Sequence, residues 1–201
     1  MKLISRSLNA MLVATCILTG CQSASVKFQA GGNAETSIRN DCYSLLHQLL
    51  DDQKNVSVLR FIKRESADVK NVIKEIAAAS GAGAKRLEDF AKADPSIHLD
   101  ETRLPAGEVA TRDAIASTKK KELLGHSGDE FELSLLLTQT EALSYAWHLA
   151  KVAGEHEFQP ERARELASLS EDMKHLYQEV FGLLLSKTKL SLALPIKTEK
   201  N

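Results

Sequence analysis

The stretch GDEFELSLLLTQTEALSYAWHLA, from Gly128 to Ala150, decides the fold class of this chain. Its apolar residues return every three or four positions, the spacing that gathers side chains on one face of an α-helix. The resulting stripe consists of Phe131, Leu135, Ala142, Ala146, Leu149 and Ala153. The pattern predicts a helix from Asp129 to about Glu155. Ser127, just before it, is expected in an interhelical turn, because the Gly-x-Ser-x-Gly spacing of a nucleophile elbow is missing.

Three further segments show the same period and predict long helices. They run from about Glu35 to Asp52, from about Val56 to Ala79, and from Pro160 to Leu185. Their stripes are Ile38, Cys42, Leu45, Leu46 and Leu49; then Leu59, Ile62, Val69, Val72, Ile73 and Ile76; then Leu166, Leu169, Met173, Leu176, Tyr177, Val180 and Leu184. The second segment meets Ser80-Gly81-Ala82-Gly83, where two glycines predict a stop or a kink. A short continuation follows to Ala93.

The middle of the chain predicts a crossover. Residues 94–107 are polar and contain Pro95 and Pro105, which is typical of a loop. A shorter helix is expected from near Glu108 to Leu124, with Val109, Ile115 and either Leu123 or Leu124 toward the core. Aromatic residues make up only 5% of the chain, a composition that favours helices over sheets. We therefore expect an all-α fold: an up-down four-helix bundle with a long middle crossover and a short extra helix.

The first residues have the organisation of a secretory signal. Lys2 and Arg6 precede an apolar run that ends in small residues before Cys21. Eleven residues of helix rise only about 16 Å, roughly half the thickness of a hydrocarbon core, so a permanent membrane span is not expected. The predicted organisation is a signal over 1–20, a flexible tether over 21–34, the helical bundle over 35–185 and a C-terminal tail over 186–201.

Leu18-Thr19-Gly20-Cys21 resembles the lipobox of bacterial lipoproteins. The resemblance implies that Cys21 carries a thioether-linked diacylglyceryl group and becomes the first residue after cleavage. The expected partner is then a membrane, through this covalent lipid, and no other cofactor is expected. Gln22 follows the cysteine where an Asp would favour the inner membrane, so the analogy favours the periplasmic face of the outer membrane. An envelope protein or polymer is a further candidate partner.

The quoted stretch and LASLSEDMKHLYQEV, from Leu166 to Val180, resemble a family of uncharacterised bacterial periplasmic helical bundles of the ferritin-like class. Di-iron members of that class use Glu-x-x-His on two helices. This sequence contains no Glu-x-x-His, and the nearest motif is Asp172-x-x-His175. At about 100° per residue, the histidines at 47, 148 and 175 fall off the apolar stripes. We expect no metal centre and no catalytic residue.

Three polar residues lie near the expected core: Glu65, Thr138 and Gln139. They predict either a satisfied set of buried hydrogen bonds or a small polar or metal pocket. Cys42, the only cysteine expected after Cys21, is interpreted as a small buried hydrophobe. With 26 Lys and Arg against 27 Asp and Glu and no basic stripe, a nucleic acid is not an expected partner.

These observations favour a non-enzymatic envelope lipoprotein that acts by binding or structural contact. One alternative is a ferritin-like metal-binding or redox bundle, which requires Glu65 to approach Gln139. Another is a chaperone that uses apolar grooves left by the crossover.

Overall fold

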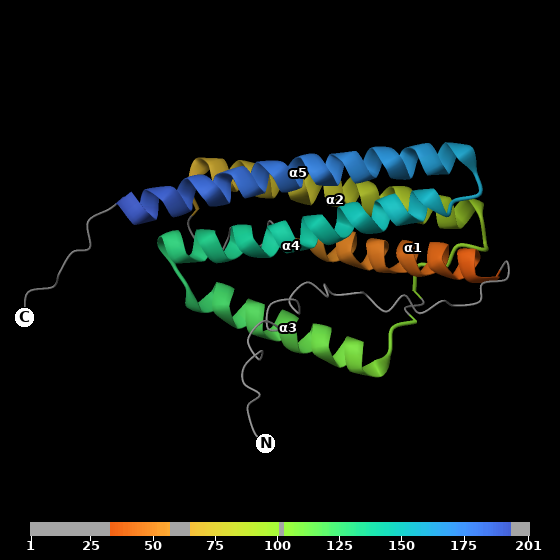
Figure 1. Ribbon diagram of the computed structural model, residues 1–201, viewed down its shortest axis with the longest axis horizontal. Helices are drawn as coiled ribbons and strands as arrows, with labels where there is room; N and C mark the ends of the chain where they lie inside the picture. Colours follow the sequence, from red (N-terminus) through yellow and green to blue (C-terminus); the bar gives the residue numbers. More distant parts are fainter. Residues whose placement is uncertain (1–32, 57–64, 101–102, 194–201) are drawn as a thin grey trace, which may run out of the picture. The chain divides into compact units, whose positions relative to one another are not determined.

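The computed structural model describes residues 33–56, 65–100 and 103–193, and every regular element in these ranges is an α-helix. The five helices are α1 (Asn33–Gln53), α2 (Ala67–Ala93), α3 (Ala106–Gly125), α4 (Gly128–Glu155) and α5 (Pro160–Ala193), as Figure 1 shows. The expected all-α class is confirmed. The expected signal, Cys21 and nearly all of the tether lie outside the described residues.

Helix α1 packs against α2 and α4, and α5 packs against the same two helices. Arg39, near the start of α1, bonds to Ser96 just beyond the end of α2, so these two helices are antiparallel. Glu132, near the start of α4, accepts a hydrogen bond from the Ser66 backbone just before α2, so α2 and α4 run in the same direction. The chain must therefore return from one end to the other between α2 and α4, and α3 lies in that return (Figure 1).

The apolar stripes form the core where the structure describes them. Phe131, Leu135, Ala146, Leu149 and Ala153 of α4 are buried, while Ala142 is half-buried. From the other helices the core receives chiefly Cys42, Leu46, Val69, Val72, Ile73, Ile76, Leu166, Leu169, Met173, Leu176 and Val180. Ile38 is an exception, because its side chain is exposed. Leu59 and Ile62 lie outside the described residues.

A helix stop at Ser80–Gly83 is wrong, because α2 continues through these residues to Ala93. The glycine serves packing. A Cβ atom at Gly83 would lie 2.9 Å from Leu50 Cδ1 and 3.0 Å from Leu169 Cδ1. Gly83 thus lets α1 and α5 approach α2 closely. The helix also begins at Ala67, later than the expected Val56.

Helix α3 begins and ends within two residues of the expected positions; of its expected core contacts, the one at Leu123 or Leu124 is confirmed, and those at Val109 and Ile115 are wrong. Val109 and Ile115 are exposed, and Leu123 is its one buried residue. The reason is that α3 packs chiefly on α4 and is held there largely by polar pairs. Arg112 bonds to the Tyr145 hydroxyl at 3.1 Å, and Lys119 pairs with Glu141.

Helix α5 continues past Leu185 to Ala193, so the segment expected as a tail is helical as far as that residue. The extension has a partner in the body of the protein. Lys187 Nζ lies 2.6 Å from Glu132 Oε2 and 3.1 Å from Ser66 Oγ. An ammonium group held in this way stabilises the turn of helix that carries it.

Candidate functional site

The three polar residues expected near the core are not joined by any hydrogen bond described for residues 33–56, 65–100 and 103–193. Gln139 is buried, as expected, and its Oε1 accepts no hydrogen bond in this part of the chain. Thr138 is half-buried, and its hydroxyl donates to Ser134 O of the same helix at 2.9 Å. Glu65 is half-buried just ahead of α2, outside any helix.

The buried carboxylates of the structure are two others, and the first is Glu157 at the turn between α4 and α5. Its side chain is fully buried. Tyr43 donates to Oε2 at 2.6 Å, and Arg162 donates to Oε1 at 2.9 Å and to Asp94 at 2.8 Å. Arg39 Nη1 lies 4.0 Å from Oε1. We call these five residues the Glu157 cluster.

The electrostatics of the Glu157 cluster favour a permanent ion pair. Burial opposes ionisation of Glu157, but hydrogen bonds from Arg162 and Tyr43 outweigh it, so its pKa lies below the ordinary value. Burial, together with the bond to the same carboxylate, raises the pKa of Tyr43. The arrangement has neither a free nucleophile nor a poised acid, and it connects α1, α2 and α5.

The second buried carboxylate is Glu132 of α4. It accepts from Ser66 N and pairs with Lys187. Burial opposes its ionisation, but the bonds from Lys187 and Ser66 prevail, and its pKa is also lowered. A signal for this residue exists in the sequence, because Glu132, Leu136, Gln139 and Leu143 repeat at helical spacing and all are buried. A second stripe therefore lies beside the first on α4.

The three histidines expected off the apolar stripes, at positions 47, 148 and 175, divide into two groups. His148 and His175 are exposed, as expected. His47 of α1 also lies outside the main core, but it faces α2. Its Nε2 is 3.5 Å from Glu88 Oε1, and its side chain is only 18% exposed. Asp51, one turn further along α1, completes a group whose ligand atoms all lie within 4.8 Å of one another.

Cys42 is buried, and burial together with the nearby Asp41 raises the pKa of its thiol to about 11. The thiolate form required for nucleophilic attack or metal binding is therefore disfavoured. The interpretation of Cys42 as a small core residue agrees with its position.

An apolar hollow of about 510 Å³ runs between α4 and α5. Its lining includes Leu137, Tyr145, Tyr177, Phe181 and Leu184. Leu137 is 53% exposed and Phe181 42%, and the rings of Tyr177 and Phe181 stack with centroids 5.9 Å apart. Large apolar side chains are thus presented to solvent on two adjacent helices. We call this surface the α4–α5 groove.

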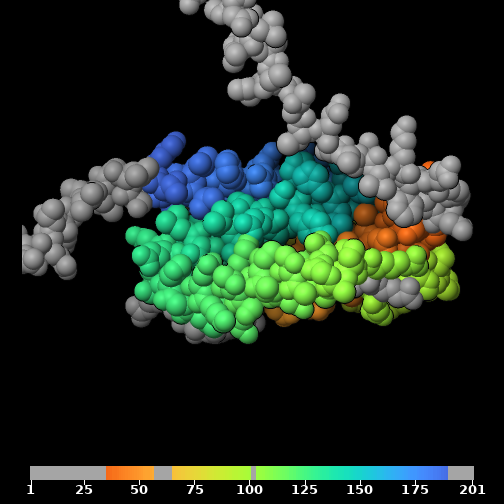
Figure 2. Space-filling model, turned by 60° about the horizontal axis from the view of Figure 1, so that its bottom comes forward, coloured from red at the N-terminus to blue at the C-terminus, as the bar shows by residue number. Residues whose placement is uncertain are grey.

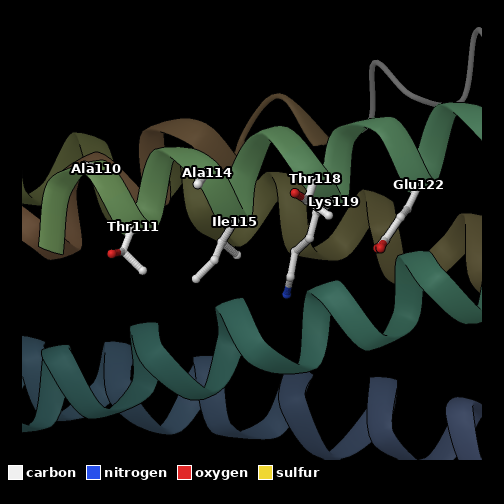
Figure 3. Close-up of a pocket in the computed structure, with 7 residues that line it drawn as sticks. All are labelled: Ala110, Thr111, Ala114, Ile115, Thr118, Lys119 and Glu122. Atoms are coloured by element: carbon white, nitrogen blue, oxygen red, sulfur yellow. The ribbon is translucent and has the colours of Figure 1, made fainter. Parts of the chain in front are cut away.

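A second hollow, of about 530 Å³, lies along α3. Figure 3 shows the side chains of Thr111, Ile115 and Lys119 directed toward α4, and Figure 2 shows α3 as a green ridge alongside that helix. Lys119 lines this hollow, Glu141 lines the α4–α5 groove, and their side chains form an ion pair.

Comparison of the chain with protein-family models, with curated proteins and with solved structures returns no match. Among the described residues, no helix combines the length and apolar character needed to cross a bilayer. The fold and site define an all-helical protein with an exposed apolar groove and two buried ionic clusters.

Proposed function

We propose that this chain is a lipid-anchored protein of the bacterial cell envelope that acts by binding and not by catalysis. Its anchor is the lipid on Cys21, and its position is the periplasmic face of the outer membrane. The sequence Leu18-Thr19-Gly20-Cys21 behind an apolar run supports the anchor. Two or more acyl chains would hold the body at the membrane, since one chain alone binds only marginally.

For the body we propose the ferritin-like arrangement of four helices, α1, α2, α4 and α5, with α3 in the middle crossover. The packing of α1 and α5 against both α2 and α4 supports it, as does the shared direction of α2 and α4. The proposal concerns the arrangement of helices. The metal-binding or redox alternative of that class depends on Glu65 approaching Gln139.

The observation that carries the binding function is the α4–α5 groove. On α5, Tyr177, Phe181 and Leu184 form an apolar ridge at helical spacing. The facing ridge of α4 presents Leu137 and Tyr145, with the polar residues Thr140, Glu141, Ser144 and His148 beside them. Such a pair of ridges accepts a third helix, whose apolar side chains enter the groove between them. We therefore propose that the occupant is an amphipathic helical segment of another envelope protein. The chaperone alternative uses the same surface but without preference among clients.

The anchor and the groove are tested separately. Mass spectrometry of the full chain from bacterial membranes should show a lipid-modified Cys21 at the N-terminus, and Cys21→Ser should release the protein from the membrane fraction. A Cys21→Ser protein that stays in the membrane fraction argues against the anchor.

For the groove, a photo-crosslinking amino acid replaces Phe181 in the full chain within its own envelope. Phe158, an equally aromatic and 56% exposed residue outside the groove lining, is the matched control. A discrete adduct from position 181 that Leu137→Ser removes, with none from position 158, supports the groove. Equal adducts from both positions, or a ladder of many adducts from 181, contradict a specific helical partner.

A further inference from the structure

We propose that His47, Asp51 and Glu88 form a binding site for Zn²⁺ on the surface between α1 and α2. Their ligand atoms already lie within 4.8 Å of one another. Zn²⁺ binds imidazole nitrogen and carboxylate oxygen at about 2.0–2.2 Å, which places tetrahedral ligands about 3.3 Å apart. His47 Nε2 and Glu88 Oε1, at 3.5 Å, are close to that spacing. The carboxylate of Asp51 lies within 4.8 Å of both.

The backbone holds the three groups in place without a ligand. His47 and Asp51 are four residues apart on α1, so their side chains lie one above the other. Glu88 faces them from α2, and α1 and α2 pack directly against each other. Because both helices are rigid, a metal ion would meet a nearly preformed site, and little conformational entropy would be lost on binding.

The imidazole of His47 is the second observation that points to a ligand. Its Nε2 atom is shielded from solvent, yet it makes no hydrogen bond to the described residues, because the contact with Glu88 at 3.5 Å is an ion-pair contact only. A buried ring nitrogen in a folded protein normally has a hydrogen-bond partner. A metal ion between Nε2 and the two carboxylates would supply the missing interaction.

A polar hollow of about 360 Å³ adjoins the site, which gives an ion access to it. His47 and Glu88 line this hollow together with His98 and Asp100 from the segment after α2. Zinc sites with three protein ligands keep a fourth position for water or another ligand. The hollow beside His47 and Glu88 has room for such a ligand, so the proposed coordination is His47, Asp51, Glu88 and one water molecule.

Lys54 competes with the ion for one ligand. Its ammonium group pairs with Asp51, and this hydrogen bond lowers the pKa of the Asp51 carboxyl. A cation at the site must displace that ammonium group and tolerate its charge nearby. Removal of the Lys54 charge should therefore strengthen metal binding, a gain that a merely damaged protein would not show.

The test titrates Zn²⁺ into the full chain, purified in a mild detergent and stripped with a chelator, by isothermal calorimetry. The expected result is one ion per chain. His47→Asn and Glu88→Gln should each weaken binding by about tenfold or more, the loss typical of changes around a metal site. Lys54→Met should strengthen binding by up to about thirtyfold, as removal of one unit charge at about 4 Å from a divalent cation in water implies. Co²⁺, titrated in the same way, should give visible absorption bands of a four-coordinate site.

His175→Asn is the matched control, because His175 and Asp172 are exposed on one helix. It should leave affinity and stoichiometry unchanged. Circular dichroism melts establish that each variant is folded before titration. The proposal is overturned if the wild-type protein shows no saturable Zn²⁺ binding, or if His47→Asn and Glu88→Gln both bind as tightly as wild type. It is equally overturned if His175→Asn weakens binding as much as they do.

Discussion

The Glu157 cluster makes the sharpest prediction about stability. Glu157→Gln keeps the size of the side chain but removes a buried charge. Among the described residues, Glu157 is the acidic partner of Arg39, and it shares Arg162 with Asp94. Breaking a buried ion pair from one side typically costs about 3–5 kcal/mol, because the remaining charge is left without a partner. Asp94 still binds Arg162, so the lower end, about 3 kcal/mol, is expected.

The assay is thermal unfolding at pH 7, followed by circular dichroism. For a chain of this size, about 3 kcal/mol corresponds to a fall in Tm of about 6–12 °C. Glu161→Gln is the matched control, since Glu161 is 87% exposed and 3.9 Å from Arg164. Its effect should stay within about 0.5 kcal/mol, as for other exposed pairs. A Glu157→Gln protein as stable as this control would refute the reasoning.

The same residue predicts a pH dependence. Because the pKa of Glu157 is lower in the folded protein than in the unfolded chain, the folded state is stabilised above the unfolded pKa of about 4.3. That contribution disappears as the pH falls through the lower folded value. The wild-type protein should therefore lose stability more steeply below pH 4 than Glu157→Gln does. Parallel acid limbs in the two proteins would show that the carboxylate is not paired.

Three further changes test the packing. Gly83→Ala should destabilise the protein by about 1–3 kcal/mol through overpacking. Gly182→Ala, also inside a helix but with open space around it, should stabilise the protein by about 0.5–1 kcal/mol. Chemical denaturation measures both, and a stabilising Gly83→Ala would contradict the close approach of Leu50 and Leu169 to Gly83. Gly128→Ala should cost about 1–2 kcal/mol in the same assay, because its φ of 57° is unfavourable for a residue with a Cβ, and an unchanged midpoint would argue against that conformation. Lys187→Met removes the ion-pair partner of Glu132 and should speed amide hydrogen exchange in the last turns of α5. Lys189→Met, at an exposed position, should leave that exchange unchanged. Equal exchange in the two variants would show that the Lys187–Glu132 pair does not stabilise the extension of α5.

Helix positions were largely predictable from the sequence because they depend on local periodicity. The stripe of α4 identifies its own buried face, and the bounds of α1 and α3 differ from the prediction by at most two residues. The error at Gly83 has a physical cause. A glycine that ends a helix and a glycine that admits a neighbouring side chain look the same in one sequence, and only the position of Leu50 and Leu169 distinguishes them.

The polar contacts were not predictable for a related reason. Glu157 is an ordinary charged residue in the sequence, and the helical repeat that includes Glu132 indicates only the face of α4 on which it lies. The partners of both carboxylates are more than 50 positions away or on another helix. His47 fell off the apolar stripe of α1, which is correct, but position on one helix does not reveal what a neighbouring helix places opposite. The facing carboxylate of Glu88 becomes visible only when α1 and α2 are packed.

The two ionic clusters together explain how α2 keeps its register. Glu132 holds the backbone of Ser66 at the start of α2, and Arg162 of the Glu157 cluster holds Asp94 at its end. Glu132 belongs to α4 and Arg162 to α5, so the α4–α5 pair holds α2 at both of its ends. Apolar packing alone tolerates a helix sliding along its axis by one turn more readily than it tolerates an unpaired buried charge. A one-turn slip of α2 would remove Ser66 from Glu132 and Asp94 from Arg162 at once, so these two contacts favour a single register, and with it the opposition of Glu88 to His47 on which the proposed zinc site depends.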